Sequence, residues 1–501
     1  MHELLSAVAK ILSYPTILWI ALGEVLGILL GALPGLTATM GMALMLPISF
    51  YLTPEASIGL MLGVYFGAVS GASIPAILFG IPGNPNAIAT VYDGYAMARK
   101  GEGGVALGTA VVASFIGGLG SMLVLFFAAP LLAAASLWFG PAEYFSLAVA
   151  SLTVIAATSG KAISKGILAA LFGMMLGTVG IDSIAGLPRF TLGNIYLLNG
   201  FSLVAALIGL FGIAQVLEDL ETTRKGGLQA VIPKIGKVFP SMKYLISRAR
   251  IILESIGIGT VIGALPGAGA SVGVVLAYER AREISPEKEK FGKGALDGVL
   301  APEVANNACI GGGLIPTLAL GIPGESAAVM LMAALIMHGI APGPMLFGKH
   351  MDLVYAIFVA MVVSNICMLL FQLGGVRLFA RALMIPPYLL STLVLLLSII
   401  GAFALESSVF DAFAAVAFGI LGWWMKRAGY PVIPLVLGLI LGPMLESEFR
   451  RAVMIAGTYT TFFTRPLSLA LLAGGALYLA HQIRKLRKEA AAEAAASGGG
   501  A

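Results

Sequence analysis

The sequence predicts an all-α polytopic membrane protein, and three observations support this class. Of its 501 residues, 59% are hydrophobic and only 11% are charged, and the mean hydropathy is +0.97. Soluble domains usually carry about 25% charged residues, so this chain could not solvate itself in water. The 64 glycines and 25 prolines indicate closely packed and interrupted membrane helices.

A helix needs about 20 apolar residues to cross a bilayer. Several of the apolar stretches are interrupted by glycine and proline, so we predict about 12 transmembrane helices, some of them broken or re-entrant. The stretches lie at 16–33, 56–80, 104–135, 141–158, 162–180, 199–217, 251–278, 295–320, 325–341, 352–383, 387–405, 409–425, 431–445 and 466–483.

Two repeated words indicate an internal duplication. Gly31–Gly35 recurs letter for letter as Gly263–Gly267, an offset of 232 residues, and Ile74–Gly83 resembles Ile315–Gly324 at an offset of 241. The same order and a similar offset argue against coincidence. If each copy has an odd number of spans, the two repeats are inverted, as in many secondary transporters, and this is the arrangement that we expect.

Charge and composition divide the chain into five segments. We predict a first membrane repeat at 1–217, a basic linker at 218–250, a second membrane repeat at 251–446, a C-terminal helix with a basic end at 447–488, and a disordered Ala/Gly-rich tail at 489–501. A cytoplasmic linker would agree with the excess of Lys and Arg on the cytoplasmic side of membrane proteins.

The first repeated word places a Pro-Gly pair inside an apolar stretch in each half. An interrupted helix exposes amides, which favour anions at a helix N-terminus, and carbonyls, which suit a small cation such as Na⁺. A simple proline kink is the alternative. The candidate substrate-binding residues at these breaks are Pro34, Gly35, Thr37, Thr39, Pro266, Gly267 and Ser271.

The second repeated word ends in another pair of breaks. Asn84 and Asn86 follow the first copy, and their amides can donate to and accept from a carboxylate or hydroxyl group. The second copy has Glu325 and Ser326 at this place; Ser326 joins the candidate substrate site, and Glu325 is a candidate for binding the coupling ion. An ordinary surface loop between two helices is the alternative.

Three polar residues share one helix face within an apolar stretch. Glu303, Asn306 and Asn307 stand at i, i+3 and i+4. Polar side chains at membrane depth need partners, so we predict Asn306 and Asn307 in the substrate site and Glu303 as a second ion-coupling candidate. Hydrogen bonding between helices is the alternative.

Several other classes of site are excluded or disfavoured. The sequence has no GxxxxGK[ST] phosphate loop and no HExxH motif, and its four histidines are scattered. Cys309 and Cys367 show no metal-ligand spacing. No basic face with readout groups indicates nucleic-acid binding. We therefore predict no enzyme, no catalytic residue, no cofactor and no protein-bound metal apart from Na⁺ at the Pro-Gly breaks.

Five long segments resemble the TctA family, the large membrane subunit of the tripartite tricarboxylate transporters. They are GALPGLTATMGMALMLP (31–47), GASIPAILFGIPGNPNAIATVYDGYAMARKGEGGVALG (71–108), GALPGAGASVGVVLAYERAR (263–282), APEVANNACIGGGLIPTLALGIPGESAAVMLMAALIMHGIAPGPMLF (301–347) and GYPVIPLVLGLILGPMLESEFRRA (429–452). The resemblance covers residues from about 16 to 465.

The resemblance implies a multi-pass permease of the bacterial inner membrane. It implies two partners, a small TctB-like membrane subunit and a periplasmic, TctC-like solute-binding protein that delivers a citrate-like carboxylate. Uptake would be driven by a Na⁺ or H⁺ gradient. An elevator mechanism is implied by related ion-transporter folds, with a moving part that holds 31–50, 71–97, 263–278 and 301–340. A passive carboxylate channel and a membrane sensor or enzyme are the alternatives.

Overall fold

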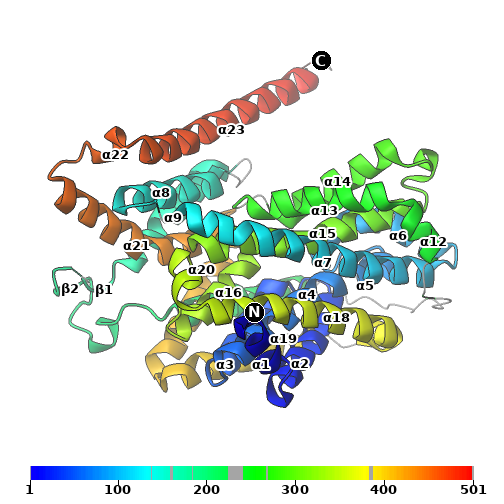
Figure 1. Ribbon diagram of the computed structural model, residues 1–501, viewed down its shortest axis with the longest axis horizontal. Helices are drawn as coiled ribbons and strands as arrows, with labels where there is room; N and C mark the ends of the chain where they lie inside the picture. Colours follow the sequence, from blue (N-terminus) through cyan, green and yellow to red (C-terminus); the bar gives the residue numbers. More distant parts are fainter. Residues whose placement is uncertain are drawn as a thin grey trace.

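The chain folds almost entirely into helices, with one small antiparallel sheet in its described part (Figure 1). The structure is a computed structural model that describes residues 2–136, 138–157, 162–182, 184–223, 238, 241–266, 269–382 and 387–498. Much of the predicted basic linker and the candidate residue Gly267 therefore lie outside the described residues. The predicted all-α class is confirmed.

The first half of the chain contains most of the short elements. It comprises α1 (His2–Ile11), α2 (Tyr14–Ala32), α3 (Ala38–Phe50), α4 (Pro54–Gly71), α5 (Ser73–Phe79), η1 (Pro85–Ala87), α6 (Ile88–Arg99), α7 (Gly103–Ser136), α8 (Pro141–Ala157), α9 (Ile163–Gly177), β1 (Gly180–Ile181), β2 (Pro188–Arg189), η3 (Ile195–Leu197), α10 (Leu203–Leu207), the π-helix η4 (Ile208–Ile213) and α11 (Ala214–Thr223).

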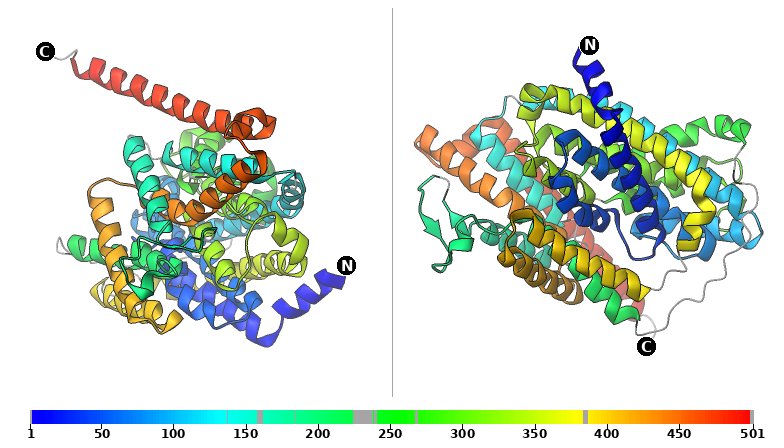
Figure 2. Two further views of the ribbon diagram at one scale, coloured as in Figure 1. Left: turned by 90° about the vertical axis from the view of Figure 1, so that its left-hand side faces the viewer. Right: turned by 90° about the horizontal axis from the view of Figure 1, so that it is seen from below.

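The second half has longer helices. It comprises α12 (Met242–Ser247), α13 (Ala249–Ala264), α14 (Ala270–Ile284), η5 (Lys288–Lys290), α15 (Asp297–Leu320), α16 (Ser326–Met337), α17 (Pro344–Lys349), α18 (Met351–Ala382), α19 (Pro387–Glu406), α20 (Val409–Arg427), α21 (Val432–Ala456), α22 (Thr461–Thr464) and α23 (Pro466–Gly498). Helix α23 runs along one edge of the molecule, far from α1 (Figures 1 and 2).

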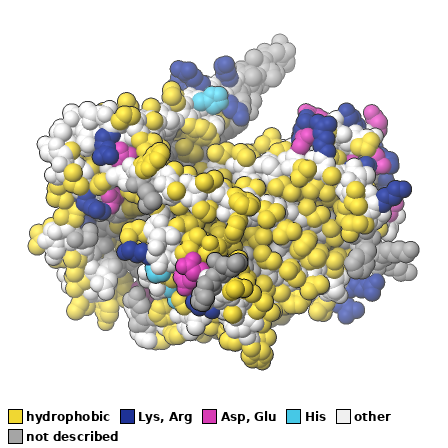
Figure 3. All heavy atoms as spheres, viewed as in Figure 1, with side chains coloured by type: hydrophobic (Ala, Val, Ile, Leu, Met, Phe, Trp, Pro, Cys, Tyr) yellow, Lys and Arg dark blue, Asp and Glu magenta, His cyan; other side chains and the backbone are white. Residues whose placement is uncertain are grey.

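Eight helical segments of the described residues are long and apolar enough to cross a membrane. They are Tyr14–Ala32, Pro54–Phe79, Gly103–Ala135, Leu203–Glu221, Met351–Arg381, Val409–Arg427, Val432–Ala456 and Pro466–Lys488. Large apolar side chains such as Phe127 on α7 are exposed, and Figure 3 shows a broad hydrophobic surface across the middle of the molecule. The chain is therefore a multi-pass membrane protein.

Two helices extend beyond the segment boundaries that the sequence predicts. Helix α21 runs through the predicted boundary at 446 without a break. Helix α23 continues to Gly498, into the stretch that we expected to be disordered. The Ala-rich composition of that stretch favours helix, because alanine has the highest intrinsic helix propensity. The five-segment division stays a prediction.

Glycines allow α2 and α4 to pack with their backbones in contact. A β-carbon at Gly27 of α2 would lie 2.5 Å from the Val64 carbonyl oxygen, and one at Gly31 would lie closer still to that of Ala68. In the same way, a β-carbon at Gly67 of α4 would lie 2.5 Å from the Glu24 carbonyl oxygen. Small residues at this spacing are typical of close helix pairs in membranes. The pair holds the end of α2, where the first break begins.

The second half repeats this kind of contact around α15. A β-carbon at Gly263 of α13 would lie 2.5 Å from the Cys309 carbonyl oxygen, and one at Gly259 would lie closer still to that of Ala305. On the other side of α15, a β-carbon at Gly117 of α7 would overlap the Val304 carbonyl oxygen. Helix α15 is thus enclosed by α7 and α13, and nearly all of its side chains are buried.

We expect Gly27→Val to destabilise the protein by more than about 2 kcal/mol, because a rigid backbone contact cannot absorb two methyl groups. The measurement is the melting temperature of the detergent-solubilised protein. It is obtained by size-exclusion chromatography of samples heated to a series of temperatures. Gly474→Val on α23 is the matched control, since no atom lies within 4 Å of a β-carbon at that position. Equal melting temperatures of the two variants would contradict the packing argument.

The short sheet belongs to a loop that is anchored to α21 by charges. The Asp182 carboxylate accepts hydrogen bonds from the amides of Ile184 (2.8 Å) and Ala185 (3.1 Å). Its other oxygen lies 2.8 Å from the Arg450 guanidinium and 3.4 Å from that of Arg189. The two amide donors, together with Arg450 and Arg189, lower the pKa of Asp182 from its ordinary value to about 2.

Arg189 completes the anchor from the loop side. Its guanidinium binds both Glu446 oxygens, at 2.6 and 3.1 Å. Arg450 also contacts Glu446, at 2.5 Å. Because a lowered carboxyl pKa stabilises the folded loop above the unfolded value of about 3.9, this contribution is complete near neutral pH and is lost as the pH falls toward 2.

Asp182→Asn keeps an oxygen that can accept from the two amides and removes only the charge. We expect it to increase the rate of chymotrypsin cleavage near the exposed Phe190 about threefold at pH 7.5, because losing the networked ion pairs raises the population of the opened, cleavable loop. Arg451→Gln is the control, since Arg451 pairs within its own helix with Glu448. Cleavage at the wild-type rate would show that the charges do not hold the loop.

Candidate functional site

The first break in the first half follows α2. The chain leaves the helix at Leu33 (φ −90°, ψ 117°), and Gly35 has a φ of +92°, which favours glycine. Helix α3 then begins at Ala38, and the Thr37 hydroxyl accepts a hydrogen bond from the Met40 amide at 3.3 Å. Pro34 and Gly35 are exposed, whereas Thr37 is half-buried.

The second break in the first half follows α5. Gly80 ends that helix in the left-handed conformation (φ 71°, ψ 20°). The Asn84 side chain then accepts from the Asn86 amide at 3.0 Å and caps the turn η1. The Gly35 amide donates to the Gly83 carbonyl at 3.1 Å, so the two breaks of this half are in direct contact.

The corresponding breaks of the second half have nearly the same backbone. Leu265 after α13 has φ −86° and ψ 110°, close to the angles at Leu33. Gly321 after α15 has φ 72° and ψ 22°, close to the angles at Gly80. Helix α14 begins after Gly269, and Pro266 and Ser271, on either side of the undescribed residues 267 and 268, are half-buried.

The N-cap positions of η1 and α16 also share a conformation but differ in chemistry. Asn84 has φ −143° and ψ 171°, and Glu325 has φ −147° and ψ 170°. Asn84 caps its turn, whereas Glu325 makes no capping bond, and its Oε1 is buried without a partner in the described part of the chain. This carboxyl group lies over Gly313, where a β-carbon would be 3.3 Å from Oε1.

The breaks of the two halves meet across the molecule. Thr39 of α3 and Ser326 of α16 share a hydrogen bond of 2.9 Å between their hydroxyl groups. Helix α3 packs against α16, and α14 packs against α6 and η1. Figure 1 shows α3 and α16 close together in the lower part of the molecule. The structure thus brings the elements that follow the four breaks into contact in pairs, α3 with α16 and α14 with η1. The described residues of the four breaks are 33–37, 80–84, 265–266 with 269, and 321–325.

Glu303, Asn306 and Asn307 lie on the buried face of α15, which packs against α6 and η1. The Glu303 carboxyl group accepts hydrogen bonds from Thr90 at 2.6 Å and Ser114 at 3.3 Å. Asn306 donates to the Val69 carbonyl at 3.5 Å. These residues connect α15 with α4, α6 and α7, and among the described residues none of their hydrogen bonds reaches a break.

The one described hydrogen bond of the Asn307 side chain lies within its own helix, α15. Its Nδ2 donates to the Glu303 carbonyl at 3.3 Å, and its Oδ1, like that of Asn306, is buried without a hydrogen-bond partner in the described residues. The Oδ1 atoms of both side chains are therefore buried acceptors without a described donor. If these residues served only in hydrogen bonding between helices, we would expect both oxygens to have partners within the protein.

The sequence analysis did not identify Thr90 and Ser114. Thr90 could have been predicted from the sequence, because it follows Asn86 by four residues and so would lie on the same side of a helix that starts at the break. Ser114 had none, because a serine within the apolar stretch 104–135 has no spacing that relates it to Glu303. Only the packing of α7 on α15 brings it there.

The four breaks can bind an anion with backbone groups. The N-termini of α3 and α16 carry free amides and a positive dipole end, and the hydroxyls of Thr39 and Ser326 lie between them. The described residues contain no cluster of three or more His, Cys, Asp or Glu side chains that could hold a metal ion. The arrangement suits recognition of a carboxylate with few charged side chains.

Comparison with known proteins identifies the family. The sequence profile described as "Tripartite tricarboxylate transporter TctA family" matches residues 17–437. The chain belongs to the TctA family. The resemblance found in the sequence motifs is thereby confirmed, and all four breaks of this TctA protein lie within the matched residues.

Two curated relatives come from Agrobacterium vitis. An uncharacterized 52.8 kDa protein in the TAR-I ttuC′ 3′ region is 36% identical over 462 residues, which cover 92% of this chain and 91% of that protein. An uncharacterized protein in the TAR-II ttuC′ 3′ region is 35% identical over 218 residues, which cover 43% of this chain and 90% of that protein. No solved structure matches this TctA chain.

Proposed function

We propose that this chain is the large permease subunit of a tripartite secondary transporter that imports a tricarboxylate or a related carboxylate. The observation that carries the proposal is the meeting of four helix breaks from two halves of the chain, joined by the Thr39–Ser326 hydrogen bond, in a member of a transporter family. Convergent half-helix ends at the centre of a membrane protein are typical of substrate sites in secondary transporters.

In this proposal the substrate is held mainly by backbone amides and neutral side chains. Thr37, Thr39 and Ser326 supply hydroxyls at the ends of α3 and α16, and Asn84 and Asn86 supply amides near η1. Pro34, Gly35 and Pro266 shape the described parts of the breaks, and Ser271 contributes at the start of α14. Charge inside a membrane is costly, so a co-transported cation, Na⁺ or H⁺, would offset part of the charge of the anion.

The family description implies the partners. A tripartite system would add a small TctB-like membrane subunit and a TctC-like solute-binding protein to this TctA chain. The solute-binding protein would be periplasmic, which would place the chain in the bacterial inner membrane. The absence of a phosphate-loop motif from the sequence supports uptake driven by an ion gradient rather than by nucleotide hydrolysis.

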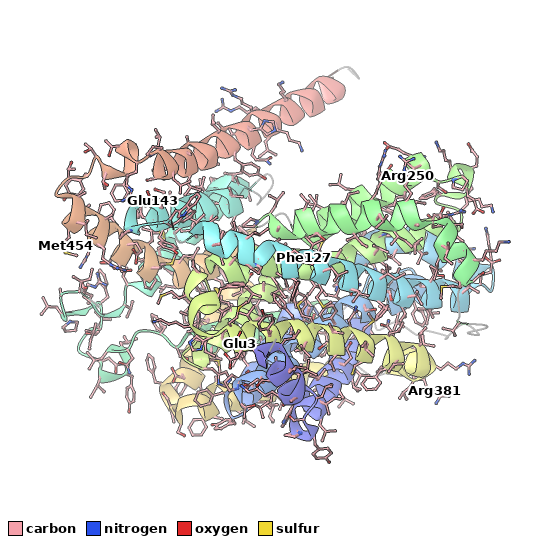
Figure 4. The ribbon with its side chains drawn as sticks, in the orientation of Figure 1. Glu3, Phe127, Glu143, Arg250, Arg381 and Met454 are labelled. Atoms are coloured by element: carbon pink, nitrogen blue, oxygen red, sulfur yellow. The ribbon has the colours of Figure 1, made fainter. Side chains whose placement is uncertain are left out.

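The matched backbone angles of the paired breaks support a repeated local structure in the two halves. In this proposal the two repeats are inverted, and the broken segments move as an elevator. The distribution of charge supports an orientation. Arg250 and Arg381 lie at the same end of the molecule, opposite Glu143 and Met454 (Figure 4), and Lys and Arg side chains gather at that end (Figure 3). We infer that this basic end is cytoplasmic.

The deciding experiment is uptake of labelled citrate into proteoliposomes that hold this chain and its small membrane subunit, with purified binding protein outside. We expect accumulation above equilibrium under an inward Na⁺ or H⁺ gradient, and none without one. A panel of di- and tricarboxylates identifies the substrate if citrate fails. Equilibration without accumulation for every carboxylate would favour the passive channel, and the absence of any flux would refute carboxylate transport.

We expect Asn84→Ala to reduce uptake at least tenfold if Asn84 contacts the substrate, because losing a buried polar contact costs about 1.5 kcal/mol or more. Asn194→Ala is the matched control: Asn194 caps η3 by the same bond, from the Tyr196 amide at 3.0 Å, but lies in the loop after β2. Similar uptake by both variants would show that Asn84 only caps η1 and does not contact the substrate.

A further inference from the structure

A carboxyl group with no described counter-charge is buried at the crossing of three helices. Glu303 of α15 is completely buried. Its Oε1 accepts from the Thr90 hydroxyl of α6 at 2.6 Å, and its Oε2 accepts from the Ser114 hydroxyl of α7 at 3.3 Å. Glu303, Thr90 and Ser114 together form the Glu303 triad. It is separate from the four breaks but is joined to one of them through α6.

No basic side chain of the described residues forms an ion pair with Glu303. Helices α7 and α16, which pack against α15, contain no titratable residue. Helix α6 presents Asp93 to the start of α15, but that carboxylate already accepts from the amides of Gly294 and Ala295, at 2.7 Å each, and from the Tyr278 hydroxyl of α14 at 2.9 Å.

The cationic side chains on the other helices packed against α15 are paired or exposed: Arg250 of α13 pairs with Glu254, and Arg99 of α6 and Lys349 of α17 are exposed. The titratable residues of α4 are Tyr65, which is buried, and Glu55, which pairs with Lys10. On α13, Glu254 pairs with Arg280 of α14. An ionised carboxylate without a counter-charge costs several kcal/mol in such surroundings, so a proton is the charge partner that fits Glu303.

The duplication inferred from the repeated words provides an internal comparison. At the offset of 241 residues, Glu303 corresponds to Leu62 and Thr90 corresponds to Leu331. Both leucines are completely buried, and α4, which carries Leu62, packs against α16, which carries Leu331. At the same offset Ser114 corresponds to Tyr355 of α18, so the other half keeps a hydroxyl at one position and has leucines in place of the acid and of Thr90. A polar triad is not needed to pack the helices, and its presence in one half only points to a function.

The Glu303 triad is also linked to the proposed substrate site. Thr90 is the third residue of α6 and stands four residues after Asn86 of η1. While the carboxyl group is charged, it can only accept from Thr90, and once it is protonated, it can also donate to a neighbouring oxygen. A proton at Glu303 therefore changes the bonding of the helix that follows Asn84 and Asn86.

We propose that Glu303, held by Thr90 and Ser114, binds the proton that enters together with the carboxylate. This inference rests on the proposed function, secondary import of a carboxylate, and adds the identity of the coupling ion and its residue. One such site per chain gives one proton per transport cycle through this route. Sodium coupling at the breaks is the competing arrangement.

The experiment compares two transport modes in proteoliposomes that hold the membrane subunits, with binding protein outside. Counterflow, the exchange of labelled external for unlabelled internal carboxylate, needs only the substrate site. Accumulation under a gradient of about one pH unit, with the membrane potential clamped, needs coupling and can reach about tenfold for one proton. We expect Glu303→Gln to keep counterflow and to lose the accumulation.

Glu24→Gln is the matched control. Glu24 is also completely buried on a spanning helix, and neither of its carboxyl oxygens has a hydrogen-bond partner in the described residues. We expect this variant to retain both transport modes. Loss of pH-driven accumulation in Glu24→Gln but not in Glu303→Gln would overturn the assignment.

A pH indicator trapped in wild-type proteoliposomes provides a second measurement that does not depend on a variant. We expect internal acidification when the carboxylate enters. Carboxylate entry without acidification, or undiminished accumulation by Glu303→Gln, would overturn the inference. If Glu303→Gln also loses counterflow, Glu303 is needed for substrate exchange itself, and its assignment as the coupling residue is overturned. Failure of wild-type counterflow with every carboxylate would instead refute the proposed function, and with it this inference.

Discussion

The absence of water inside a bilayer is the constraint on which this structure depends. A helix that stops in that environment leaves amides and carbonyls without solvent, so each break must find partners within the protein. The Gly35 amide finds the Gly83 carbonyl, and Gly83 and Gly324 lie against the carbonyls of Gly31 and Gly263. The close glycine contacts of α2 with α4 and of α13 with α15 bring these groups within reach.

The same constraint explains why the breaks converge. A break that faced lipid would be unstable, whereas two breaks that face each other satisfy some groups and leave others for a ligand. Thr39 and Ser326 already bond across the two halves, so the protein is stable at this point before any substrate arrives. A carboxylate could then be bound by amides and hydroxyls that the fold has positioned, at little cost in ordering.

The two halves are alike in backbone and unlike in polar side chains. Their paired breaks have nearly the same angles, yet Asn84 is a buried cap and Glu325 is a half-buried acid whose buried Oε1 has no partner among the described residues. Glu303 likewise stands where the other half has Leu62. In the proposed transporter, the repeated backbone would provide a similar frame for binding in each half, and the differences between the halves would provide the acids for ion coupling.

The sequence alone determined the membrane class, the family and the positions of the breaks, because hydropathy and the Pro-Gly words are local properties of the chain. It also predicted that the residues at the breaks act together, and the Thr39–Ser326 bond agrees with this. Only the tertiary structure showed which partners Asn306, Asn307 and Glu303 bind, and it joined Glu303 to Thr90 and Ser114. These contacts span up to 213 residues of sequence, and helix packing, which no local pattern encodes, decides them.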